Sequence, residues 1–190
     1  MSASILLGRA EAMGLLGDFG TISRLDAPLI SAVLRRLGEA GLLQRAVAQG
    51  RAGRLPTDAG GMGALLRVAN VALEDSPLPI EEWPALRTTL GDKMLARLCG
   101  ISEVSLRRYA SNLRPTPDLV AQRLHTLALI VADLRGAYND YGIRRWFQRP
   151  RAQLGGRAPE DLLQAGWTPD RPEVKQLREL AEGLTSSPAT

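Results

Sequence analysis

This chain has few of the side chains on which catalysis and covalent cross-linking depend. Its 190 residues include one histidine and one cysteine, and aromatic residues make up 4% of the sequence. A single cysteine excludes an internal disulfide, which favours a reducing compartment. His125 and Cys99 cannot hold a metal ion by themselves, and neither an HExxH nor a paired CxxC motif is present. We therefore expect a binding protein rather than an enzyme, with no cofactor and no metal.

Long apolar runs and strand-forming residues are also scarce. No stretch resembles a signal peptide or an 18-residue apolar span, so we expect a cytoplasmic protein. Apolar residues make up 45% of the chain and charged residues 23%, which is ordinary globular composition. Frequent alanine and leucine with few aromatics favour helices over strands. The composition therefore predicts an all-α fold.

The charge is distributed unevenly along the chain. Residues 87–151 contain 12 Lys or Arg and 5 Asp or Glu, whereas residues 74–86 contain four acids and no base. A basic segment beside acidic ones suggests a surface that meets an anion, with nucleic acid as the first candidate. A solvated basic face without a partner is the alternative.

The N-terminal third has the pattern of short helices. A helix is predicted over 28–41, where Pro28 suits a first helical position and Gly41 suits the residue after a helix end. The run that follows it, with a Gly- and Arg-containing loop at 49–54, resembles a winged helix-turn-helix domain. A second helix is predicted over 62–73. We expect residues 1–74 to form an N-terminal helical region, with a winged-helix-like arrangement as one form of it.

The stretch EDSPLPIEEW combines acids with two prolines and predicts an irregular linker over 75–85. Proline lacks an amide donor and restricts the preceding residue, so no helix is expected to run through this stretch. Glu81 and Glu82 are then most simply solvated charges. A domain boundary is expected here.

Helical periodicity is stronger after this linker. Apolar residues spaced alternately by four and three predict a long amphipathic helix over 118–141, ending with Tyr138 and Tyr141. His125 follows a residue of the apolar stripe and is expected to be exposed. Shorter helices are predicted over 159–165 and 172–184.

The segment DKMLARLCGISEVSLRRYAS, residues 92–111, has the features of a helix-turn-helix. Ala96 is small where two helices would cross, Gly100 suits a turn that needs positive φ, and Ser102 suits the N-cap of a second helix. Ile101 and Leu106 would face the core. If the second helix reads DNA, the residues toward the DNA would be Ser102, Glu103, Ser105, Arg107, Arg108, Asn112 and Arg114. A scaffold role with solvated arginines is the alternative.

The run RRWFQRPRAQLGGRAPEDLLQAG, residues 144–166, resembles the toxin-binding domain of Xre/MbcA/ParS antitoxins. The shared order is a Trp-containing pair, a Pro, then Leu-Gly-Gly-Arg, another Pro and a short Leu-rich helix. The family also carries an Xre-like helix-turn-helix and a long helix upstream, which the residues from Leu86 onward resemble. The resemblance implies an Xre-like helix-turn-helix domain over 86–141 and a toxin-binding domain over 142–190.

This resemblance implies an antitoxin that binds a RES-domain toxin and covers its active-site groove. Such toxins degrade NAD or transfer ADP-ribose from it, so NAD would belong to the partner. The family also implies repression of the antitoxin's own operon, and we expect a homodimer within the toxin–antitoxin complex. A helix-turn-helix regulator without a toxin is the alternative, and a dimerising scaffold is a third class.

The residues expected to contribute to the toxin-binding region are Trp146, Phe147, Arg149, Leu154, Gly155, Gly156, Arg157, Glu160, Leu163, Lys175 and Arg178. The two glycines lack the lysine, hydroxyl residue and preceding strand of a phosphate loop, so a sharp turn is the better interpretation. That turn would bring Leu154 and Leu162 into one small core. Arg157 could bond a carbonyl or project toward the toxin, and Trp146 and Phe147 favour a core position over direct contact.

Overall fold

The computed structural model describes residues 3–17, 27–43, 62–164 and 166–186, and no residue in these ranges lies in a strand. The chain divides into two compact units, Met1–Ser76 and Pro77–Thr190. The prediction of an all-α fold is therefore confirmed for the described part of the chain. None of the helices in these ranges combines the length and apolarity needed to cross a bilayer.

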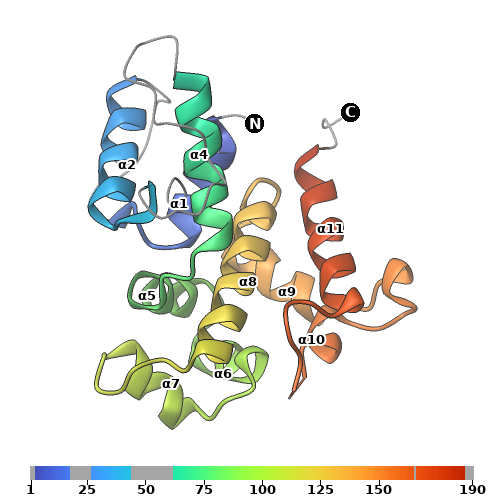
Figure 1. Ribbon diagram of the computed structural model, residues 1–190. Helices are drawn as coiled ribbons and strands as arrows, with labels where there is room; N and C mark the ends of the chain where they lie inside the picture. The colour runs from blue at the N-terminus through green and yellow to red at the C-terminus, as the bar shows by residue number, and fades with distance from the viewer. Residues whose placement is uncertain (1–2, 18–26, 44–61, 165, 187–190) are drawn as a thin grey trace. The chain divides into compact units, whose positions relative to one another are not determined.

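The first unit contains α1 (Ala3–Ala12), α2 (Ala27–Glu39) and α4 (Met62–Asp75) (Figure 1). Helix α1 packs against both α2 and α4 through aliphatic side chains such as Leu6, Leu37 and Leu73, all fully buried. The helices predicted over 28–41 and 62–73 are thus confirmed, and Gly41 has the expected positive φ of 72°. The proposed wing loop at 49–54 lies outside the described residues.

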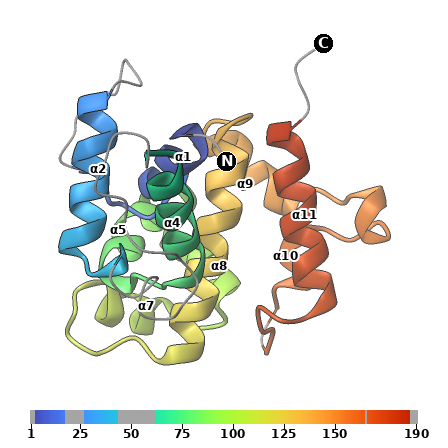
Figure 2. The same ribbon diagram turned by 45° about the horizontal axis from the view of Figure 1, so that its top comes forward.

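The second unit is built around α8 (Asp118–Arg135), which packs against α5 (Pro79–Leu90), α6 (Asp92–Cys99), α9 (Asp140–Gln148) and α11 (Pro172–Ser186). Figures 1 and 2 both show α8 between α5 and α11. Helix α7 (Glu103–Ala110) packs on α5 and α6, while the 3-10 turn η3 (Ala152–Leu154) and α10 (Pro159–Leu162) follow α9. Residues 86–141 and 142–190 thus belong to one compact unit, with α11 against α8.

Helix α8 differs from the amphipathic helix predicted over 118–141. It ends at Arg135, and Asn139 caps a new helix by accepting a hydrogen bond from the Gly142 amide at 2.9 Å. Fourteen of its residues are buried, because helices surround it on several sides. Tyr138 and Tyr141 consequently lie outside this helix's buried stripe and are 36% and 64% exposed.

The prediction that no helix runs through 75–85 is wrong, since α5 covers residues 79–90, while the two units divide between Ser76 and Pro77 within this stretch. Pro79 occupies the first turn, where amide donors have no helical partner, so only Pro84 removes a helical hydrogen bond. Trp83, Leu86 and Leu90 are buried on the inner face of α5. The burial of these side chains offsets the cost of the internal proline.

A buried hydrogen-bonded pair, Glu82 and His125, joins α5 to α8. Glu82 is fully buried and its Oε1 lies 2.6 Å from Nδ1 of His125, which is 6% exposed. The expectations that Glu82 is a solvated charge and His125 an exposed histidine are therefore both wrong. Each side chain provides a polar partner for the other, so both can be buried in an otherwise apolar core.

The segment before α11 is tied to α6 by a second buried polar group. Arg123 donates hydrogen bonds to the carbonyls of Trp167 (2.8 Å) and Cys99 (3.0 Å), and its guanidinium lies 5.5 Å from the Trp167 ring centroid. The Trp167 indole donates to the Leu98 carbonyl at 2.7 Å. These bonds satisfy carbonyls at the end of α6 and fix the chain's approach to α11.

Candidate nucleic-acid and protein-binding surfaces

Helices α6 and α7 are joined by a tight three-residue connection. Gly100 is left-handed with φ 69°, and the Ile101 amide donates to the Ala96 carbonyl at 3.0 Å. Ser102 caps α7, its Oγ accepting from the Ser105 amide at 3.1 Å. The predicted roles of Gly100 and Ser102 are confirmed. Leu106 is fully buried and Ala96 nearly so, whereas Ile101 is half-buried.

The opposite face of α7 carries the residues predicted to face DNA. Glu103, Arg107 and Arg108 are exposed and Ser105 is half-buried. Ser102, Asn112 and Arg114 are also exposed on the connections at either end of the helix. Arg107 contacts its own helix, with Nε donating to the Glu103 carbonyl at 3.3 Å. The predicted set therefore lies on α7 and its two flanking connections.

The position of α7 is set by contacts with α5. Tyr109 stacks on Trp83 with ring centroids 6.3 Å apart, and the Trp83 indole donates to Thr116 Oγ1 at 3.0 Å. These contacts place the connection after α7 as well as the helix itself. A rigid support of this kind is what a helix needs to present side chains in a fixed register.

The start of α6 is held by a paired guanidinium and carboxylate. Arg87 donates to both oxygens of Asp92, at 2.7 and 3.0 Å. This hydrogen bonding lowers the pKa of Asp92, and the nearby positive charge of Arg107 adds to the effect. The same bond raises the pKa of Arg87.

The stretch after α9 forms a tight turn, as the two glycines predict. Gly155 and Gly156 have φ values of 63° and 78°, where a side chain would be strained. The Gly156 amide donates to the Arg151 carbonyl at 2.9 Å, and the Arg151 amide donates to the Arg157 carbonyl at 3.1 Å. The chain thus folds back on itself. Leu154 is buried.

Leu162 was predicted to join the small core, but it is half-buried. The fully buried leucine at the end of α10 is Leu163. Helix α10 ends at Leu162, short of the 165 predicted. One helical step separates the two leucines by about 100°, so an offset of one residue exchanges the buried and half-buried positions.

The residues predicted to bind the toxin separate into two groups. Trp146, Phe147, Leu154 and Leu163 are at most 3% exposed, and Trp146 packs edge-to-face on Phe147 at 5.2 Å. These four shape the fold and are covered by this chain's own side chains. The remaining residues are at least partly accessible, namely Arg149, Gly155, Gly156, Arg157, Glu160, Lys175 and Arg178.

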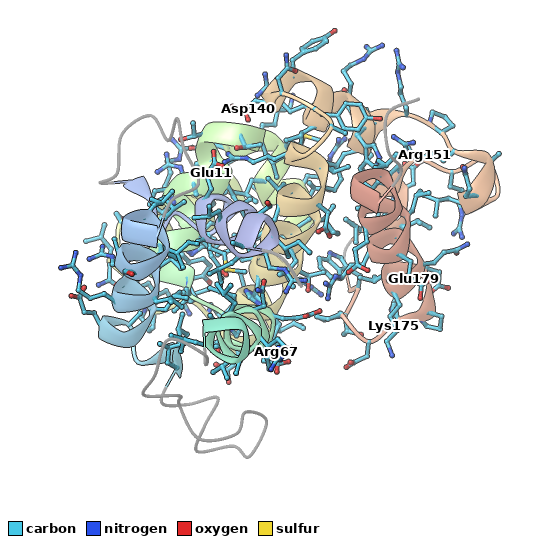
Figure 3. The ribbon with its side chains drawn as sticks, turned by 90° about the horizontal axis from the view of Figure 1, so that it is seen from above. Glu11, Arg67, Asp140, Arg151, Lys175 and Glu179 are labelled. Atoms are coloured by element: carbon cyan, nitrogen blue, oxygen red, sulfur yellow. The ribbon has the colours of Figure 1, made fainter. Side chains whose placement is uncertain are left out.

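Two of the accessible residues already have ion-pair partners within the chain. Glu160 pairs with Arg97 of α6, and Arg178 lies 3.1 Å from Glu182 on α11. Lys175 and Glu179, one turn apart on α11, project into solvent (Figure 3). Arg149, Arg157 and Lys175 are the exposed cations of the predicted set.

The Arg97–Glu160 pair marks a groove that the sequence did not predict. This groove, of about 430 Å³, lies between the α6–α7 connection and α10 and includes Ser102 and Asp161. Arg97 and Glu160 are 63 residues apart, and no periodicity or motif links them. Only the return of the chain beside α6 brings the candidate DNA-binding helix pair next to α10.

Metal binding and thiol chemistry have no support in the described part of the chain. Within it, no group of three His, Cys, Asp or Glu side chains is placed to hold a metal ion. Cys99 is fully buried, and burial raises the pKa of its thiol to about 12. A thiol with such a pKa remains protonated near neutral pH and is a poor nucleophile.

The chain matches no family model, no curated protein and no solved structure. A functional conclusion therefore depends on the geometry of these surfaces and on the residue pattern that led to them.

Proposed function

We propose that this chain is an antitoxin that neutralises a RES-domain toxin by protein–protein contact and binds operator DNA through a helix-turn-helix formed by α6 and α7. The observation that carries the proposal is the exposed Arg157 beside the left-handed Gly155–Gly156 turn, next to α10. The surrounding hydrophobic residues are buried, so the turn is a fixed platform rather than a loose loop. This arrangement supports docking into a partner's cleft.

The contact surface would consist of the exposed cations of this region. Arg149, Arg157 and Lys175 carry positive charge and no intramolecular ion pair is found for them among the described residues. An NAD-binding groove receives the pyrophosphate of NAD. The planar guanidinium of arginine can form paired hydrogen bonds with the polar groups of such a groove. Insertion of Arg157 would exclude NAD from the groove by steric and electrostatic means. NAD would thus be the partner's ligand, and this chain needs no cofactor.

The test is co-expression with a RES-domain protein encoded beside this chain. The native chain should restore growth and co-purify with the toxin, while Arg157→Glu should weaken both through charge reversal at the contact. Arg171→Glu is the matched control, since Arg171 is exposed on the same part of the chain but lies outside the predicted contact set. If the native chain neither restores growth nor co-purifies, the antitoxin proposal is wrong.

DNA binding is tested separately on α7. Arg107→Ala with Arg108→Ala should weaken binding to the operator and reduce the dependence of affinity on salt by about one to two phosphate contacts. Arg35→Ala is the control, since Arg35 is an exposed arginine of α2 in the other unit. An unchanged salt slope would exclude contact between α7 and the phosphates.

A transcription regulator without a toxin is the second candidate. It is favoured by the contacts of α7 and the connection after it with Trp83, which would hold this helix for DNA binding and lie outside the proposed toxin contact surface. The two tests distinguish these functions: operator binding without toxin neutralisation would support the regulator.

A further inference from the structure

The connection between α8 and α9 forms a pocket that shares one residue, Arg149, with the proposed toxin contact surface. It has a volume of about 230 Å³ and lies against the first two turns of α9 and the residues that follow this helix. The side chains lining it are Tyr138, Tyr141, Arg145, Trp146, Arg149 and Arg151. Three arginines and three aromatic rings therefore meet around one small volume.

The charged side chains that line this pocket are all arginines. None of its described lining residues carries a carboxylate. The carboxylate next to them in sequence, Asp140 at the start of α9, does not line the pocket and lies 4.0 Å from Arg135. Arginines placed together repel one another unless an anion is present. The composition of the lining thus excludes a cation as ligand and favours an oxyanion.

Arg151 is held in place even though its charge is partly buried. Its guanidinium lies 4.6 Å from the centroid of the Trp146 ring, in cation–π geometry. Burial lowers the pKa of Arg151, a hydrogen bond and charge interaction with Tyr138 oppose this shift, and the charge of Arg149 adds to it. Arginine remains protonated under such conditions. The site therefore keeps a desolvated positive charge.

Two buried donors in the pocket wall lack an acceptor within the described structure. They are the indole Nε1–H of Trp146, whose residue is 2% exposed, and the Nε–H of Arg151. The other two tryptophans differ, since Trp83 donates to Thr116 and Trp167 donates to the Leu98 carbonyl. Buried donors in folded proteins are nearly always paired with protein or ordered water, and two such donors on residues of one cationic pocket fit a ligand that accepts hydrogen bonds.

Gly142 keeps the aromatic side of the pocket in place. A Cβ at this position would lie 3.0 Å from Cβ and 3.1 Å from Cδ1 of Tyr138, which is closer than ordinary packing. Because one of these atoms is the Cβ of Tyr138, which ring rotation cannot move, the clash could be relieved only by moving the tyrosine. Glycine at 142 therefore allows Tyr138 to cover the start of α9.

We propose that this pocket binds a small molecule that carries a phosphate group on a planar ring. The arginines would hold the phosphate oxygens, the Trp146 indole would donate to one of them, and Tyr141 would stack on the ring. This inference does not depend on the proposed function.

The experiment uses the full chain labelled with ¹⁵N and follows the three tryptophan indole signals by NMR, with Trp146 assigned through Trp146→Phe. Phenyl phosphate should move the Trp146 signal in a saturable way and leave those of Trp83 and Trp167 in place. Inorganic phosphate should move it at higher concentration, because it lacks the ring, and phenol should not move it. An unmoved Trp146 signal with phenyl phosphate, or an equal shift with phenol, would overturn the proposal.

Exposed arginines of the pocket provide variants that keep the fold. Arg145→Gln with Arg149→Gln should weaken phenyl phosphate binding by about tenfold or more, through loss of two charge-assisted contacts. Gly142→Ala should weaken it by displacing Tyr138. Arg35→Gln with Arg36→Gln removes the same charge from α2 and should leave the affinity unchanged. Equal weakening by the two double variants would show nonspecific attraction and overturn the pocket assignment.

Discussion

The two compact units differ in how their cores are held together. All three tryptophans and all three tyrosines belong to Pro77–Thr190, whereas Met1–Ser76 contains a single aromatic residue, Phe19. In the described part of the first unit, aliphatic faces of three helices pack together. Among the described residues, the first unit has a buried polar bond between distant helices, from Arg9 to the Asn70 carbonyl, and the second unit has several. Aliphatic packing tolerates small shifts between helices, while directional bonds fix one arrangement. The candidate binding surfaces lie on the more constrained unit.

The largest loss of stability is expected when the Glu82–His125 pair that joins α5 to α8 is broken. Glu82→Ala removes a buried partner of His125 and should destabilise the second unit by about 3–5 kcal/mol. Tryptophan fluorescence during urea unfolding measures this, because every tryptophan lies in that unit. Glu81→Ala, at the half-buried neighbouring position, should cost under about 0.5 kcal/mol. Equal costs for the two variants would argue against a special role for the buried couple.

The next effect concerns the guanidinium that ties α6 to the segment before α11. Arg123→Met keeps the length of the side chain but leaves the carbonyls of Cys99 and Trp167 without this donor, at a cost of about 2–3 kcal/mol. Gln122→Met, exposed on the same helix, is the control and should be nearly neutral. Urea midpoints from fluorescence give both values. A neutral Arg123→Met would mean that packing alone holds these elements.

A smaller effect is expected at alkaline pH from the buried thiol. The pKa of Cys99 is about 12 in the folded chain, so the unfolded chain, with its lower thiol pKa, releases this proton first. The stability from this group is therefore complete below pH 8 and decreases as pH rises toward 12. At pH 10 the loss should be about 1–2 kcal/mol, and it should be absent from Cys99→Ala. Urea unfolding of both proteins at pH 8 and pH 10 tests this difference.

The smallest effect is expected in the first unit. Arg9 donates to the Asn70 carbonyl at 3.3 Å and to Glu74 at 3.2 Å, but the Glu74 side chain is 37% exposed and water can replace its partner. Arg9→Met should therefore cost about 1 kcal/mol. The loss should appear in helical circular dichroism and leave the tryptophan transition unchanged. A shifted tryptophan transition would show that the two units unfold together.

Local features were predictable wherever a residue acts on its immediate neighbours. Gly100, Ser102 and the Gly155–Gly156 turn have the predicted conformations, because positive φ and N-caps depend on a few adjacent residues. The helices predicted over 62–73 and 172–184 also formed, each extending two residues farther. The predicted DNA-facing residues lie on α7 and its flanking connections for the same reason: the period of one short helix decides which side chains share a face.

Predictions that depended on what surrounds a helix were wrong. Periodicity continued to Tyr141, yet α8 ends at Arg135, and His125 is buried although it lies beside the apolar stripe. Helix α8 has neighbours on several sides, so a single apolar stripe does not describe its environment. The acidic proline-containing stretch formed α5 because Trp83 and Leu86 gain burial on α8's side of the core.

The sequence by itself therefore determined a helical protein, its turns, its caps and the basic character of residues 87–151. The tertiary structure alone decided that Glu82 meets His125, that Arg97 meets Glu160, and that arginines and tyrosines converge beside Trp146. The physical reason is the separation along the chain over which each interaction acts. Backbone conformation and amphipathicity are set within a few residues, whereas partners 43 or 63 residues apart are chosen by the packing of whole helices.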